Sequence, residues 1–257
     1  MAITRANPSC LVFMLDQSAS MEDPFHKGEI SKASQVASIV NRVLHDTVMS
    51  CVHGKATYDY FDIAVIGYGA DKVSSALGGD LGNGFLFPIS TIRRNPIRKD
   101  GDTPIWVEPV AEGSTPMRAA FEKVYGLLGD WLSSHKDAVP PVVMNITDGE
   151  GNDGNPADFA LKLMELSNNV GKICLLNAHL TDKKFDPVLF PADDSLLKDD
   201  FAKALFAISS PLTDDMVALG KEKYPGLAQG ARGFVYNADA VIVTDFLDIG
   251  TKKADLR

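Results

Sequence analysis

The apolar run Cys10–Leu15 is followed directly by three polar residues at alternate positions, which are Asp16, Ser18 and Ser20. One carboxylate and two hydroxyls therefore stand at alternate positions just after an expected buried strand. Mg²⁺ and Mn²⁺ prefer carboxylate, hydroxyl and water oxygens, so this spacing indicates a divalent cation site. Asp and Ser are also preferred N-cap residues of helices. This stretch alone does not decide between the two interpretations.

Two further polar clusters follow other apolar or helical patterns. Ser114 and Thr115 precede Pro116, which opens a helical period, and Asp148 follows the apolar run 141–146. Each has a simpler explanation, because Thr115 is a good helix cap and Asp148-Gly149 is a common turn pair. In an open parallel sheet, however, ligands bind beyond the carboxyl ends of the strands. Meeting there, the clusters would supply the two carboxylates of Asp16 and Asp148 and three hydroxyls, from Ser18, Ser20 and Thr115. This set would balance a divalent ion and leave it able to accept another carboxylate.

The three clusters lie in segments that resemble the metal-site motifs of the von Willebrand factor A (VWA) family. The segments are 12–21 (VFMLDQSASM), 113–117 (GSTPM) and 145–150 (NITDGE), in the order and spacing of that family. The resemblance implies a metal-ion-dependent adhesion site (MIDAS) that accepts an acidic side chain, Glu or Asp, from a partner protein. It implies Mg²⁺ or Mn²⁺ as the ion, with Ca²⁺ disfavoured because closed calcium sites gather more acids.

The resemblance also assigns a role to each predicted ligand. Ser18, Ser20 and Thr115 would bind the ion directly or nearly so, whereas Asp16 and Asp148 would bind it directly or through water.

Apolar runs alternate with helical periods along the chain, which predicts an α/β fold with a doubly wound, mostly parallel sheet and helices on both faces. The resemblance makes this a Rossmann-like VWA fold with one short antiparallel edge strand, which agrees with the weak segment Phe85–Ile89. The other strands are expected at 10–15, 61–68, 141–146, 173–178 and 233–236. Helices are expected at 30–47, from 116, at 155–168, 196–208, 213–224 and 239–249.

The whole chain, 1–257, is predicted to be one domain with its core at about 10–247. Residues 93–113 are expected to be an insertion. Their cluster Arg93, Arg94, Arg98 and Lys99 could touch phosphates, but the acidic composition favours a solvated loop. This insertion and the loop 180–194 would border the metal face and help to choose the partner. For His179, at a strand end, an ordinary surface or half-buried histidine is favoured over a site residue.

Composition narrows the class of partner. The net charge of −9 and pI of about 5 disfavour nucleic acid and anionic membranes as partners. Three widely spaced cysteines suggest no disulfide frame. The N-terminal apolar run is too short for a signal peptide, and a membrane span needs about 18 apolar residues, so we expect a cytoplasmic protein.

The leading functional hypothesis is a protein-binding module without catalysis. The motif wording is closest to stand-alone bacterial VWA proteins, including the type associated with tellurite-resistance operons and thought to act beside protein kinases and phosphatases in signalling or stress responses. The main alternative is a metal-dependent phosphohydrolase at the same site. Haloacid-dehalogenase-type phosphatases, however, need an acid where Ser18 stands, and neither Ser18 nor Ser114 lies in a Gly-x-Ser-x-Gly elbow. A scaffold without metal is disfavoured by the intact oxygen set.

Overall fold

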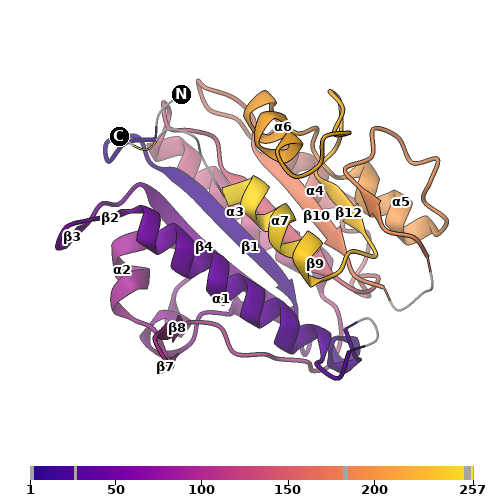
Figure 1. The fold of residues 1–257 in the computed structure, drawn as a ribbon, viewed down its shortest axis with the longest axis horizontal. Helices are drawn as coiled ribbons and strands as arrows, with labels where there is room; N and C mark the ends of the chain where they lie inside the picture. Colours follow the sequence, from indigo (N-terminus) through magenta and orange to yellow (C-terminus); the bar gives the residue numbers. More distant parts are fainter. Residues whose placement is uncertain (1–2, 26–27, 182–184, 252–255, 257) are drawn as a thin grey trace.

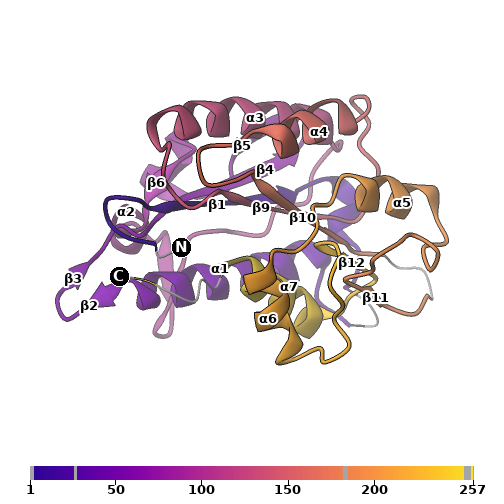
Figure 2. The same ribbon diagram turned by 90° about the horizontal axis from the view of Figure 1, so that it is seen from above.

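A computed structural model describes residues 3–25, 28–181, 185–251 and 256. A mostly parallel sheet lies between two layers of helices (Figures 1 and 2). The strand order is β11-β12-β10-β9-β1-β4-β5, and β6 also pairs with β4. The predicted α/β class with a mostly parallel sheet is therefore confirmed.

The parallel strands carry the core. They are β1 (Ser9–Asp16), β4 (Phe61–Gly69), β9 (Val142–Thr147), β10 (Cys174–His179) and β12 (Phe234–Tyr236). Along β1, Leu11 and Phe13 pack on one face of the sheet, whereas Val12 and Met14 pack on the other. Because helices cover both faces, the strands are continuously apolar rather than alternating.

Antiparallel strands occur at both edges of the sheet. β5 (Lys72–Ser75) and β6 (Phe87–Pro88) pair with β4, and β11 (Val188–Leu189) pairs with β12. The expected edge strand at 85–89 is thus present in part, because β6 contains only two of these residues and a helix begins at Ile89. β11 lies where a loop was expected, because two residues are too few to show a hydrophobic period.

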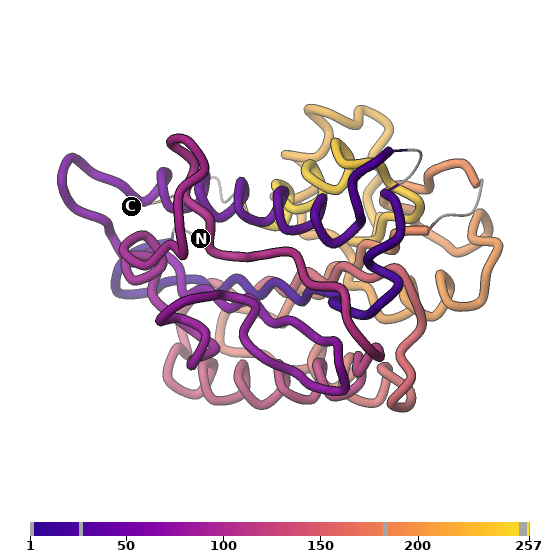
Figure 3. Tube along the Cα trace, turned by 90° about the horizontal axis from the view of Figure 1, so that it is seen from below, coloured from indigo at the N-terminus to yellow at the C-terminus, as the bar shows by residue number. Residues whose placement is uncertain are grey.

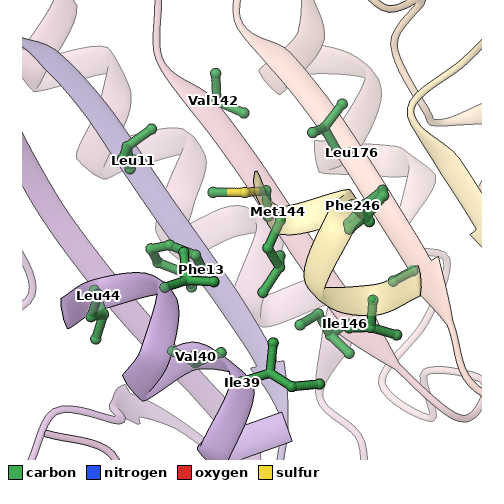
Figure 4. Close-up of a cluster of buried hydrophobic side chains, with 14 of the residues drawn as sticks. Leu11, Phe13, Ile39, Val40, Leu44, Val142, Met144, Ile146, Leu176 and Phe246 are labelled. Carbon is green, nitrogen blue, oxygen red and sulfur yellow. The ribbon is translucent and has the colours of Figure 1, made fainter. Parts of the chain in front are cut away.

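The helices divide between the two faces of the sheet, as Figure 2 shows. One layer contains α1 (Lys32–Ser50), α2 (Ile89–Arg94), α6 (Asp214–Lys221) and α7 (Ala240–Thr251). The other contains α3 (Met117–Ser134), α4 (Ala157–Glu165) and α5 (Asp200–Ala207). Figure 4 shows how Phe13, Met144 and Leu176 of the sheet face Val40 of α1 and Phe246 of α7. Burial of these side chains holds α1 against the sheet, and α1 starts at the carboxyl end of β1.

In the described part of the chain, the short elements are two further hairpins and two 3-10 helices. They are β2 (Val52–His53) with β3 (Ala56–Thr57), β7 (Arg98–Asp100) with β8 (Thr103–Ile105), η1 (Ala19–Glu22) and η2 (Gly79–Asn83). The hairpin β7-β8 lies within the segment expected as a solvated loop. The expectation of a loop is therefore wrong for the residues of this hairpin.

The second half of this segment is anchored to α1. Trp106 is 1% exposed, and its indole N–H donates to the carbonyl of Ile92 (2.7 Å). The Asn41 Oδ1 atom accepts from the backbone N–H groups of Trp106 (2.8 Å) and Val107 (3.0 Å), and its Nδ2 donates to the Val107 carbonyl (2.8 Å). From there the chain runs alongside α1 towards residue 115 (Figure 3). We call residues 106–115 the strap, because they tie the outer hairpin to the end of β1.

Two other expectations concern the chain as a whole. Within the described ranges, no helix is both long and apolar enough to cross a membrane. Cys10, Cys51 and Cys174 are buried thiols, with no disulfide between them.

Candidate metal site

Asp16 ends β1 and is 2% exposed. Its Oδ1 accepts from the Ser18 backbone N–H (2.9 Å) and its Oδ2 from the Thr147 hydroxyl (2.6 Å). Burial raises the pKa of this carboxyl to about 6, although the hydrogen bonds from Ser18 and Thr147 oppose the shift. A buried carboxylate of this kind is stabilised by a nearby cation.

Ser18, Ser20 and Asp148 form a continuous chain of oxygen atoms. The Ser18 Oγ lies 3.2 Å from the Ser20 Oγ, and the Ser20 hydroxyl donates to Asp148 Oδ1 at 2.8 Å. Ser20 and Asp148 are 128 positions apart in the sequence. The structure therefore brings the first and third polar clusters into direct contact beyond the carboxyl ends of β1 and β9.

Helix capping does not explain the positions of Ser18 and Thr115. Ser18 occupies the N-cap position of η1, but its side chain makes no capping hydrogen bond. Thr115 lies before Pro116, the N-cap residue of α3. The carboxylate of Asp153 instead accepts from the first free N–H groups of that helix, at Arg118 (3.0 Å) and Ala119 (2.8 Å). The Ser18 and Thr115 side chains are therefore not needed for capping.

Thr115 is placed between the other two clusters by its backbone. Its N–H donates to Asn152 Oδ1 (3.2 Å), and its carbonyl accepts from the Asn152 N–H (3.1 Å). Two residues earlier, the Gly113 carbonyl accepts from the Ala19 N–H (3.0 Å). Thr115 is 8% exposed. Hydrogen bonds between side chains link Ser18, Ser20 and Asp148, and the Asp16 carboxylate joins them by accepting from the Ser18 backbone. Thr115, in contrast, is held to its neighbours through its backbone.

A tight turn supports the strap at this point. Ala70 and Asp71, between β4 and β5, have positive φ values of 48° and 59°, as in the primed turns of hairpins. The Ala70 N–H donates to the Glu112 carbonyl (2.7 Å), and the Ser114 hydroxyl donates to the Asp71 carboxylate. Gly113 has a φ of 67°, and a Cβ there would lie 2.6 Å from the Ala70 Cα. Glycine is therefore required for the strap to pass the turn.

The available donors suit a hard divalent ion. Among the described residues, no group of three or more His, Cys, Asp and Glu side chains could hold a metal. A cation here would depend on two carboxylates, Asp16 and Asp148, together with hydroxyl groups. Oxygen donors of this kind suit Mg²⁺ or Mn²⁺ and lack the nitrogen and sulfur ligands typical of zinc.

The sequence did not identify Lys32 as part of this site. Its Nζ lies 2.8 Å from Asp148 Oδ2 and 3.9 Å from Asp23 Oδ2. The side chains of Lys32 and Asp148 are 3% and 1% exposed, so this is a buried ion pair. Thr147 and Asn152 were also missed as positioning residues. A lysine at the start of an amphipathic helix looks like a surface residue, and only the fold brings it to Asp148.

The remaining candidate residues lie in other surroundings. His179 is buried and packs against the rings of Phe201 (5.1 Å) and Tyr236 (5.3 Å), so the expected surface or half-buried position was too exposed. Arg93 donates to the Thr57 hydroxyl (2.6 Å), and Arg98 pairs with Glu108 (2.9 Å). In the loop 180–194, residues 182–184 lie outside the described part of the chain.

Neither a protein-family model nor a curated protein matches the chain. Solved structures similar to it include the PilB minor pilin from Streptococcus sanguinis, with 15% identity, a TM-score of 0.35 and coverage of 56% of this chain and 30% of that chain. Another is the vWF domain of the type V pili tip protein Mfa5 from Porphyromonas gingivalis, with 15% identity, a TM-score of 0.36 and coverage of 56% and 39%. The chain thus aligns with less than half the length of either structure.

Proposed function

We propose that this chain is a VWA-type, metal-ion-dependent protein-binding module. The ion would be Mg²⁺ or Mn²⁺, held by oxygen atoms of Asp16, Ser18, Ser20, Thr115 and Asp148. The observation that carries this proposal is the contact of Ser20 with Asp148 (2.8 Å) at the common end of β1 and β9. It joins two of the three predicted motifs at the edge of the sheet where ligands of such folds bind.

The proposed recognition is of an acidic side chain on a partner protein. A bound divalent ion would supply a Lewis-acidic centre that can accept a carboxylate oxygen. Asp16, Ser18 and Thr115 are each less than 9% exposed, so the protein would hold the ion from beneath. A partner's Glu or Asp would then approach from the solvent side.

We favour binding over hydrolysis on the identity of residue 18. Serine stands where the phosphatases that begin with an aspartate after the first strand place a second acid. Ser18 also lacks the Gly-x-Ser-x-Gly sequence typical of a nucleophilic serine. On the wording of the three motifs, we further propose a role in bacterial signalling or stress response beside a kinase and phosphatase system, in the cytoplasm.

A pull-down with and without EDTA tests the binding proposal. The bait is the full chain, and the variants are Thr115→Ala and the control Thr47→Ala. Thr47 is a suitable control because it is also buried (7% exposed) and its hydroxyl only bonds to the Val43 carbonyl in α1 (2.7 Å). We expect a partner that is released by EDTA, lost with Thr115→Ala and retained with Thr47→Ala.

One outcome would contradict the binding proposal, and another would favour its alternative. A complex that survives EDTA and the Thr115→Ala change would contradict the proposal. Turnover of a generic phosphoester by the wild type that disappears in Asp16→Ala would favour the phosphohydrolase instead.

A further inference from the structure

Lys32 occupies an unfavourable place for a cation. It is the first residue of α1, where the backbone N–H groups make the helix end positive and acidic side chains are preferred. The helix does not need it as a cap, because the Ser31 hydroxyl accepts from the Ser34 N–H (3.3 Å). Lys32 is nevertheless 2% exposed, which indicates that its position is set by its anionic neighbours.

Of the two acids described next to this buried charge, Asp148 is the nearer. The Lys32 Nζ lies 2.8 Å from Asp148 Oδ2, while the other oxygen of the same carboxylate accepts from Ser20. The second acid near Lys32, Asp23, is farther away (3.9 Å), and its side chain is 58% exposed, so water screens its charge. An ion bound at the proposed site would therefore share Asp148 with an ammonium group.

The shared Asp148 carboxylate changes the net charge of the site. Asp16 and Asp148 carry −2, and Lys32 reduces the total to −1. A divalent ion would bring the site to +1, and one carboxylate from outside would bring it to zero. Without Lys32 the ion alone would neutralise the site, and an additional carboxylate would leave it negative.

Resting on the proposed metal site, we propose that Lys32 is an internal counter-cation that competes with the divalent ion for Asp148. It lowers the affinity of the site for the ion alone and makes strong metal binding depend on an acidic ligand. The metal and the partner's carboxylate would then bind cooperatively, because each relieves the charge imbalance that the other creates.

Titration of the full chain with Mn²⁺ by calorimetry tests this inference. The variants are Lys32→Met, which keeps the length of the side chain without its charge, and Lys32→Arg, which keeps the charge. We expect Lys32→Met to bind Mn²⁺ about tenfold more tightly than the wild type in acetate-free buffer, and Lys32→Arg to match the wild type. Acetate, with its own Mn²⁺ complexation subtracted, should strengthen Mn²⁺ binding to the wild type more than to Lys32→Met.

Thermal unfolding gives a second readout. Lys32→Met leaves Asp148 without its buried partner, so its metal-free midpoint should be lower and its rise with Mn²⁺ larger than in the wild type. If Lys32→Met does not fold, Lys32→Gln replaces it, because the amide still donates to Asp148 without adding charge.

The outcomes separate this inference from the proposed function. Equal Mn²⁺ affinity in the wild type and Lys32→Met would overturn the inference and leave the metal site standing. Binding only in Lys32→Met would support the competition but contradict a metal-dependent function in the wild type. Absence of binding in both would overturn both proposals.

Discussion

Asp16 is the residue at which the site and the stability of the fold are most directly linked. Its carboxylate is buried, and two hydrogen bonds hold its oxygens, from the Ser18 N–H and the Thr147 hydroxyl. Burial raises the pKa of this carboxyl to about 6, because these contacts do not fully compensate for burial of the charge. The ionised Asp16 carboxylate therefore destabilises the metal-free protein, and a bound cation would reduce this destabilisation.

A pH dependence of stability follows from this shift. The folded pKa of Asp16 lies above its ordinary value of 3.8, so the protonated form favours the fold. That contribution is complete below about pH 4 and is lost as the pH rises through about 6. From this group we expect a fall of about 3 kcal/mol in the free energy of unfolding, at 1.36 kcal/mol for each pKa unit.

Urea unfolding in EDTA between pH 4 and pH 7 measures this effect as the difference between the wild type and Asp16→Asn. Saturating Mg²⁺ should remove most of the fall, because the ion stabilises the ionised carboxylate. The same pH dependence in both proteins would show that Asp16 does not carry it.

Thr147 is predicted to be a positioning residue for Asp16. Thr147→Val keeps the shape of this fully buried side chain and removes the donor to Asp16 Oδ2 (2.6 Å). We expect a loss of about 1–3 kcal/mol in the free energy of unfolding, because a buried acceptor loses its partner. The control is Thr47→Val, whose hydroxyl bonds to a helix carbonyl. Equal losses in the two variants would contradict the assignment.

Among the elements, the strap is the part of the fold that sequence reasoning described least well. Asn41 of α1 holds Trp106 and Val107 through three hydrogen bonds of 2.8 to 3.0 Å. These bonds fix the start of a segment that ends at Thr115. The strap therefore connects the packing of α1 with the position of the second motif.

Asn41→Ala should release the strap. It leaves two buried backbone N–H groups and one carbonyl without their partner, which predicts a loss of about 2–4 kcal/mol in the free energy of unfolding. Faster amide hydrogen exchange at 106–113 would localise the effect. The control is Asn169→Ala, since the Asn169 side chain bonds only to exposed Asp137 (2.8 Å). A change no larger than that of the control would mean that Asn41 does not anchor the strap.

The elements that the sequence predicted well are those with long apolar patterns. The runs at 10–15 and 61–68 correspond to β1 and β4 within one or two residues, and Pro116 directly precedes α3. The hairpin β7-β8 was missed because all three residues of Arg98–Asp100 are exposed and show no alternation. β11 has only two residues and is defined by its pairing with β12, which no local pattern encodes.

Over the whole molecule, the candidate site combines residues from three loops, of which the first and third are in contact although Ser20 and Asp148 are 128 positions apart. Its oxygen donors were predicted from three recognisable motifs, and the fold brings the first and third of these motifs into contact. The sequence did not identify Lys32, because the pairing of Lys32 with Asp148 spans 116 positions and depends on how α1 packs on the sheet. The charge balance of the site therefore follows only from the fold and the motifs together.

Because the site joins distant loops, an ion bound there should stabilise the whole fold. At a free Mg²⁺ concentration 100 times its dissociation constant, linkage predicts a gain of about 2.7 kcal/mol. Thermal unfolding of the wild type should show one cooperative transition that moves to higher temperature with Mg²⁺. In Asp148→Ala the shift should be absent, and an equal shift there would indicate that the ion binds elsewhere.

The most direct measurement of the central claim is a calorimetric titration of Mn²⁺ into the wild type, Asp16→Ala, Thr115→Ala and the control Thr47→Ala. We predict one saturable site in the wild type and the control, no binding in Asp16→Ala, and weakened binding in Thr115→Ala. No saturable binding to the wild type, or binding that is unchanged by both site substitutions, would contradict a metal site built from these three loops.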